Sequence, residues 1–338
     1  MREFNVRKGI YLTSDNSVSK LNNNILKCLI VILLFNYCKY GLTSFTHTKD
    51  ISDIFTTLII YLVPITISII TTIIINKLIK KSNKLLSSAN IIPIIISLIL
   101  VNTDTPVLVL SIISIILTIL TTINIKSKVI DSNLLAIILP SIWNIISKNN
   151  LTINNPLYNL SKINYIGTYN EVMGKFGTIL DYLLGNIYGN TSIILLIIIL
   201  IYLYYKNKSK ISIVISCLLS SFIMFSLIGI LNNMWYFYGL FNIFIGDLIF
   251  ILIFVSMDSK NSPILLNNQI IYGIITAIFL VIFRFICPVY SVIIAVTLSK
   301  LFASLLDKLI YNKKLSNLIY GIVIILLLII PITITYLL

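Results

Sequence analysis

The chain has 338 residues, of which 58% are hydrophobic and 11% are charged, and its formal net charge at pH 7 is +14. Globular domains carry roughly 25% charged residues, so the composition excludes a soluble protein and indicates a polytopic membrane protein. The four cysteines lie in apolar segments without Cys-x-x-Cys spacing, and the single histidine gives them no partner. We therefore expect no disulfide framework, zinc site or iron–sulfur cluster held by this chain alone.

Residues 1–23 form a polar leader that contains Arg2, Arg7, Lys8 and Lys20. The first apolar segment, Asn24–Tyr37, has the length of a signal-peptide core, but its polar lead is long and no small-residue cleavage site follows. We interpret this segment as a retained first span that follows a cytoplasmic leader.

Further apolar segments continue along the chain, and several are shorter than the roughly 20 residues that a straight membrane span needs. Short or interrupted spans often line a central site. The sequence therefore predicts an all-α polytopic membrane protein with ten or eleven transmembrane helices. After Asn24–Tyr37 the expected spans are Ile54–Ile75, Ala89–Val101, Pro106–Ile123, Asn133–Ser147, Ser192–Tyr205, Ile211–Leu231, Gly239–Met257, Ile270–Cys287, Tyr290–Leu306 and Leu315–Leu338.

Lysine and arginine are concentrated in every second connection between these spans. The leader and the connections after the second, fourth, sixth, eighth and tenth spans carry them, whereas those after the third, seventh and ninth carry none. By the positive-inside rule the N-terminus is cytoplasmic and the long polar stretch 148–191 faces outward. This distribution accounts for the basic balance without a nucleic-acid partner.

Five spans precede the outward loop and at least five follow it, which divides the chain into residues 24–147, the loop 148–191, residues 192–309 and a final span at 315–338. An odd number of spans per half gives the two halves opposite orientations. If the halves are structural repeats, they are inverted repeats, and a site is expected at their interface near the membrane midplane.

Three charged residues fall inside apolar segments, where charges usually pair or line a water-filled path. Asp247 and Lys300 have similar depths, and we expect them to pair. Their pair is either part of an ion or proton path or a structural salt bridge. Arg284 lies near the outer end of its span, where it either reaches a phosphate held by the outward loop or extends to the interface.

Several collinear motifs resemble one family over roughly residues 10–309. They are the leader piece Thr13–Lys20, Leu180–Ser192 in the loop, the block Phe254–Pro263 followed by Gln269–Gly273 and Arg284, and the late aspartate Asp307. Together they resemble the RnfD subunit of Rnf-type electron transport complexes, which is related to the NqrB subunit of the sodium-pumping NADH:quinone reductase. The last span lies outside the resemblance.

The resemblance implies a ten-span integral subunit of a bacterial inner-membrane complex that couples electron transport to ion transport. It implies FMN linked through its phosphate to a threonine of the outward loop, and a second, non-covalent flavin such as riboflavin. The nearest match to the attachment motif is Tyr165–Thr168, so Thr168 is the candidate attachment residue, although the usual Pro-Leu does not follow it.

We therefore predict a translocase subunit that works only with other membrane and peripheral subunits, because this chain has no nucleotide-binding motif of its own. The alternatives are a transporter-like or channel-like protein on the same scaffold without flavin, and a structural subunit. Asp247 and Lys300 replace a glycine and an asparagine of the family, and a compensating pair explains both changes.

Overall fold

A computed structural model describes residues 18–48, 52–78, 88–100, 106–123, 131–146, 183–184, 192–207, 210–231, 237–258, 262–309 and 313–337. The regular elements in these ranges are helices, and each predicted span is occupied by a helix or by a broken helix. The all-α polytopic fold is thus confirmed. Whether 24–147 and 192–309 are separable units stays a prediction.

The first half consists of helices that follow the predicted apolar segments closely. They are α1 (Val18–Thr48), α2 (Ser52–Leu78), α3 (Ser88–Leu100), α4 (Val107–Ile123) and α5 (Ser132–Ile146). Helix α1 extends beyond the predicted first span at both ends and includes the polar residues that flank that span. Prolines inside α2, α3 and α5 interrupt no assigned helix, as is common in membrane helices, where neighbours satisfy the freed backbone groups.

The second half contains a broken span among continuous helices. Its helices are α9 (Ile193–Asn207), α10 (Ile211–Leu231), α11 (Phe237–Phe244), α12 (Leu248–Ile251) with the π-helix η2 (Leu252–Ser256), α13 (Leu266–Ile286) and α14 (Ser291–Leu309), followed by α15 (Lys313–Leu337). Helix α11 and the α12–η2 segment together occupy the predicted eighth span and are bent by 57° relative to each other.

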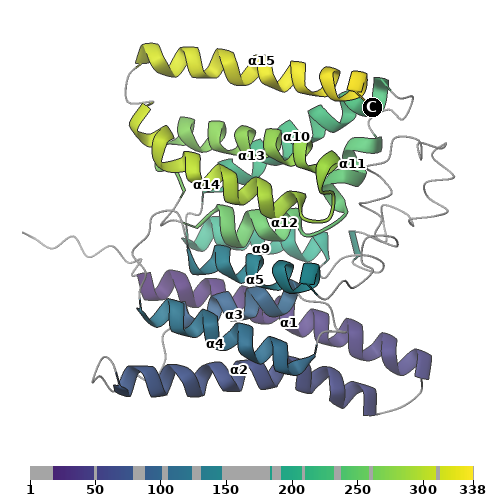
Figure 1. The fold of residues 1–338 in the computed structure, drawn as a ribbon, viewed down its shortest axis with the longest axis vertical. Coiled ribbons are helices and arrows are strands. Elements are labelled where there is room, and N and C mark those ends of the chain that lie inside the picture. The colour runs from purple at the N-terminus through teal and green to yellow at the C-terminus, as the bar shows by residue number, and fades with distance from the viewer. Residues whose placement is uncertain are drawn as a thin grey trace, which may run out of the picture.

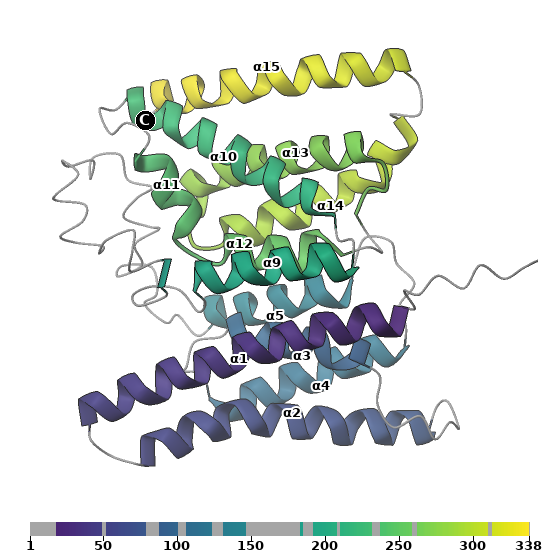
Figure 2. The same cartoon turned by 180° about the vertical axis from the view of Figure 1, so that it is seen from behind.

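The two halves lie side by side, with α1–α5 at the lower end of the view in Figure 1 and α10–α15 at the upper end. In the first half the second and fourth helices, α2 and α4, pack together, and in the second half the equivalent helices α10 and α13 do the same. Figure 2 shows from behind that α9 and α5 lie in the middle of the stack. This shared packing is what repeated halves would produce.

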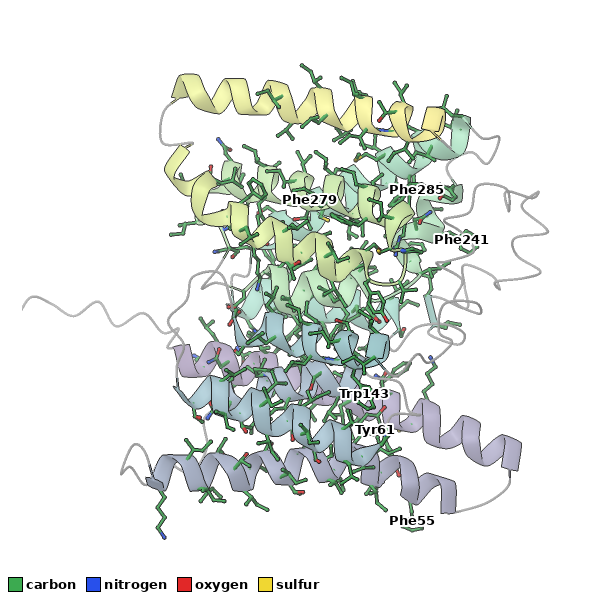
Figure 3. The ribbon with its side chains drawn as sticks, in the orientation of Figure 1. Phe55, Tyr61, Trp143, Phe241, Phe279 and Phe285 are labelled. Carbon is green, nitrogen blue, oxygen red and sulfur yellow. The ribbon has the colours of Figure 1, made fainter. Side chains whose placement is uncertain are left out.

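Among the described residues, four helices (α1, α2, α10 and α13) are long and apolar enough to cross a membrane, and the bent pair α11 with α12–η2 makes a fifth candidate. Six other apolar helices in these ranges are shorter. Large apolar side chains also cover the outside of the bundle, including Phe55, which is 62% exposed and projects from α2 in Figure 3. An apolar exterior of this kind matches a lipid environment rather than water.

Glycine permits very close helix packing in the second half. A Cβ atom on Gly273 of α13 would lie 1.9 Å from Ser216 Oγ and 2.7 Å from the Ile213 carbonyl oxygen of α10. A Cβ on Gly239 of α11 would lie 2.4 Å from Ser226 Oγ. Small residues allow membrane helices to approach in this way, and here they fix α11 and α13 against α10.

Candidate functional site

The two halves meet along a small set of helix contacts. Helix α5 of the first half contacts α14 and η2 of the second half, and α1 contacts α9. We call the contact of α5 with α14 and η2 the half-interface. Because inverted-repeat membrane proteins place their sites between the repeats, the polar groups of the half-interface are the first candidates for function.

An ion pair crosses the half-interface. Lys300 Nζ of α14 lies 3.7 Å from Asp131 Oδ2, directly before α5, and the side chains are only 1% and 8% exposed. The distance is longer than a hydrogen bond, so the contact is electrostatic. Removing one partner of a buried ion pair leaves an uncompensated charge and costs about 3–5 kcal/mol, which makes this pair a strong constraint on how the halves dock.

Asp131 is held in place by the start of α5. Its carbonyl oxygen accepts a hydrogen bond from the Leu135 backbone N–H at 3.0 Å, and Ser132 Oγ lies 3.4 Å from Asp131 Oδ1. The carboxylate therefore lies at the positive end of the α5 dipole, where a negatively charged group is favourable. In α14, Ser299, which is next to Lys300, donates a hydrogen bond to the Tyr272 hydroxyl of α13 at 3.3 Å. This bond links α14 to α13.

A second acidic residue lies next to the half-interface. Asp258 follows η2, which contacts α14. The Asp258 carbonyl accepts hydrogen bonds from Ser262 Oγ at 2.6 Å and Ser262 N at 3.2 Å. Lys210 in turn donates to the Ser262 carbonyl and hydroxyl, both at 2.8 Å. The π-helix ends directly before this turn, and such segments are common at functional sites.

The predicted pair of Asp247 with Lys300 is not formed. In the part of the chain that the structure describes, Lys300 pairs with Asp131 instead, and no ion pair includes Asp247. The sequence marks Lys300 as a charge inside an apolar segment, but it does not predict the partner, because the partner depends on which helix of the other half packs against α14. Asp131 carried only the signal of an aspartate directly before an apolar segment, which is typical of a helix N-cap.

Asp247 lies instead at the break of the eighth span. The chain leaves the helix at Ile245, Gly246 adopts a positive φ of 91°, and Asp247 precedes α12 without a side-chain cap hydrogen bond. Only glycine adopts such a φ readily. Transporters form ion sites at broken membrane helices, and Asp247 adds a carboxylate at this break, so Asp247 is the second candidate for function.

Arg284 is fully buried rather than extended to the interface. Its Nη1 donates to the Pro288 carbonyl and to Ser291 Oγ, and its Nη2 donates to the Asn242 carbonyl at 2.8 Å. These bonds connect the α13–α14 turn to α11. Its contact with a phosphate stays a prediction, because the outward loop is described only at residues 183–184.

Thr168, the candidate flavin attachment residue, lies outside the described residues. The backbone of Asp307 is described as part of α14, but its side chain is not. One contact of the Leu180–Ser192 motif is visible. Ser192, which is 5% exposed, donates from Oγ to the Leu183 carbonyl at 2.8 Å. This bond joins the end of the loop to the start of α9.

Comparison with known proteins identifies a family. The model of the NQR2, RnfD, RnfE family matches residues 5–316 of the chain, and only the first residues of α15 fall within this range. A search of curated proteins found no match.

Proposed function

Because the chain belongs to the NQR2, RnfD, RnfE family, and is therefore a membrane subunit of the Rnf or Nqr type, we propose that it is the D-type subunit of an Rnf-like electron transport complex. In this role it carries electrons by means of bound flavin and takes part in cation transport across the bacterial inner membrane. The observation that carries the proposal is the family match over nearly the whole chain. The packing of two similar helical halves supports it.

The chain's own contribution is to hold and orient a cofactor. FMN, when bound, supplies the one-electron chemistry. Thr168 supplies a hydroxyl in the outward loop for a phosphoester bond, and this assignment is based on the sequence motif. Neighbouring subunits of the complex are the source and the destination of the electrons.

The second candidate is a transporter-like or structural subunit without flavin. The departure of the sequence around Thr168 from the attachment motif favours it. Both candidates retain the half-interface and Asp247, so the two differ only in the cofactor.

Fluorescence of the denatured protein separates the two candidates. The protein, purified from its native host, is run on a denaturing gel under ultraviolet light. We expect a fluorescent band at the mass of the subunit, with an FMN-sized increment by mass spectrometry. Both signals disappear in Thr168→Ala because the ester oxygen is removed, whereas Thr178→Ala, in the same loop, keeps them. A dark wild-type band without the mass increment refutes covalent attachment and favours the second candidate.

A further inference from the structure

Arg284 caps the helix end that the break of the eighth span creates. At the end of α11 the Ile245 backbone N–H donates to the Phe241 carbonyl at 2.8 Å. The chain then leaves the helix at Gly246, which has a φ of 91°, and the Asn242 carbonyl accepts from Arg284 Nη2 at 2.8 Å. The last carbonyls of a helix have no donor within the helix and carry partial negative charge. A guanidinium group at this place supplies both a donor and a positive charge.

The guanidinium group is itself fixed on its other side. Its Nη1 donates to the Pro288 carbonyl at 3.2 Å and to Ser291 Oγ at 2.9 Å, where the chain passes from α13 into α14. Ser291 Oγ donates in turn to the Pro288 carbonyl at 2.8 Å. Arg284 and Asn242 are both 0% exposed, so bulk water does not compete for these bonds. One side chain thus ties the end of α11 to α13 and to the start of α14.

The position of Asp247 depends on where α11 ends. Helix α11 lies so close to α10 that a Cβ atom on Gly239 would lie 2.4 Å from Ser226 Oγ. Asp247 makes no side-chain cap hydrogen bond, and its carbonyl accepts from the Ile251 N–H at 2.9 Å as α12 begins. It follows Gly246 directly, and glycine adopts many backbone conformations. The end of α11 therefore has to be fixed for the carboxylate to keep one place.

We propose that Arg284 is a positioning residue for the binding of the transported cation by Asp247, an inference that rests on the cation transport of the proposed function. Broken membrane helices bind cations at the carbonyl ends of their half-helices. Here the guanidinium group already occupies the carbonyl end of α11. A cation that enters the break is therefore bound by the Asp247 carboxylate, at a place that Arg284 sets through α11.

The test measures cation uptake driven by electron transfer in proteoliposomes that contain the whole complex. The initial rate is recorded against sodium concentration at fixed pH, and against pH at fixed sodium concentration. Arg284→Lys keeps the charge, but its single nitrogen lacks the fork with which the guanidinium group reaches α11 and the α13–α14 turn together. The control Thr276→Val removes a buried hydrogen bond that stays within α13, from Thr276 Oγ1 to the Tyr272 carbonyl at 2.8 Å.

We expect Arg284→Lys to raise the cation concentration at half-maximal uptake by about threefold to tenfold, with the maximal rate within about twofold of the wild type. A displaced carboxylate binds the cation less tightly, but it still carries the cation once it is bound. Thr276→Val leaves the half-maximal concentration unchanged. Added to Asp247→Asn, the change Arg284→Lys causes no further shift, because both changes act on the same binding step.

An unchanged half-maximal concentration in Arg284→Lys overturns the proposal, as does a lower maximal rate alone, which is the result of a merely structural role. An equal shift in Thr276→Val overturns it as well, because any loss of α13 structure then has the same effect. A wild-type complex that responds to neither sodium nor protons refutes the proposed function and this inference together. That outcome is distinct from the others because it appears without any substitution.

If Arg284→Lys does not assemble, hydrogen exchange of the wild-type complex decides. The cation to which uptake responds is added, and exchange is corrected for the intrinsic rate at each pH. We expect the cation to slow the exchange of backbone amides at residues 246–248 and to leave residues 241–245 unchanged, because Arg284 holds the end of α11 with and without the cation. Any other pattern overturns the proposal.

Discussion

Two buried charges of this protein are held by groups from another helix. Arg284 of α13 donates to the carbonyl of Asn242 in α11, and Lys300 of α14 pairs with Asp131 before α5. Buried charges are tolerated when other protein groups replace the lost water. The arginine uses neutral carbonyl and hydroxyl acceptors, whereas the lysine uses the carboxylate of Asp131. The first is therefore a structural clamp, and the second is a charge-balanced contact between halves.

Asp247 is the residue that we expect to couple electron transfer to cation movement. In Asp247→Asn the neutral amide no longer attracts a cation to the break between α11 and α12, so the rate of cation uptake falls by about tenfold, the equivalent of roughly 1.4 kcal/mol. The measurement is cation uptake driven by electron transfer in proteoliposomes that contain the whole complex.

A matched control for this change is Asp50→Asn, which removes an aspartate from the connection between α1 and α2 and leaves uptake unchanged. Uptake at the wild-type level in Asp247→Asn contradicts the role of Asp247 in the cation path.

The sequence identified the charged residues inside the apolar segments, Lys300 among them. It did not find the Asp131 partner, because a pair between halves depends on how α5 packs against α14 and η2. That arrangement is a property of tertiary packing and leaves no periodic signal in either segment. Asp131 also lies just outside its predicted span, Asn133–Ser147, and so was not among the charges expected inside the membrane.

Among the helices, the close contact between α10 and α13 depends on glycine. In Gly273→Ala the new Cβ meets Ser216 Oγ and the Ile213 carbonyl oxygen, and overpacking of this kind costs about 1–3 kcal/mol. We expect a melting temperature lower than that of the wild type by about 2–10 °C in thermal unfolding experiments on the purified protein.

The double change Gly273→Ala/Ser216→Ala tests the cause of this loss. It removes the hydroxyl but leaves the backbone carbonyl of Ile213 at 2.7 Å from the new Cβ, so it restores only part of the lost stability. A melting temperature of Gly273→Ala equal to that of the wild type contradicts the packing argument.

The sequence predicted a helix in every span, because a run of apolar residues that crosses lipid satisfies its backbone hydrogen bonds as a helix. The break of the eighth span was not predicted at its position. Gly246 and Asp247 in an apolar segment carry a signal for it, but the segment around them reads as one continuous span. The structure shows that the positive φ of Gly246 divides it.

At the scale of the whole molecule, lysines mark one face of the bundle. Lys77 lies in the last turn of α2 and Lys206 in the last turn of α9. In Figure 1 the end of α2 and the start of α15 lie on the left, and the C-terminus lies on the right. From the positive-inside rule we expect the lysine-bearing face to be the cytoplasmic one.

This orientation predicts which cysteine reacts from outside the cell. Cys287 follows α13 and is exposed, whereas Cys28 and Cys217 are buried. In intact cells that express the full chain, we expect a membrane-impermeant maleimide to label the protein, and Cys287→Ser to remove most of the label. The exposed Cys38 lies in α1 and accounts for any remaining label.

Labelling of Cys287 only after the membrane is permeabilised places the end of α13 in the cytoplasm. The whole assignment of the two faces is then reversed, since the helices are connected in a fixed order.

The ion pair between Asp131 and Lys300 also has a consequence for biosynthesis. The ribosome makes the first half before the second, so the carboxylate before α5 enters the membrane region long before its ammonium partner in α14. Until then Asp131 has to stay hydrated at the membrane surface. Closure of the two halves around the pair is therefore a late event of folding, and the nascent first half depends on water, lipid headgroups or the insertion machinery for the charge that Lys300 later provides.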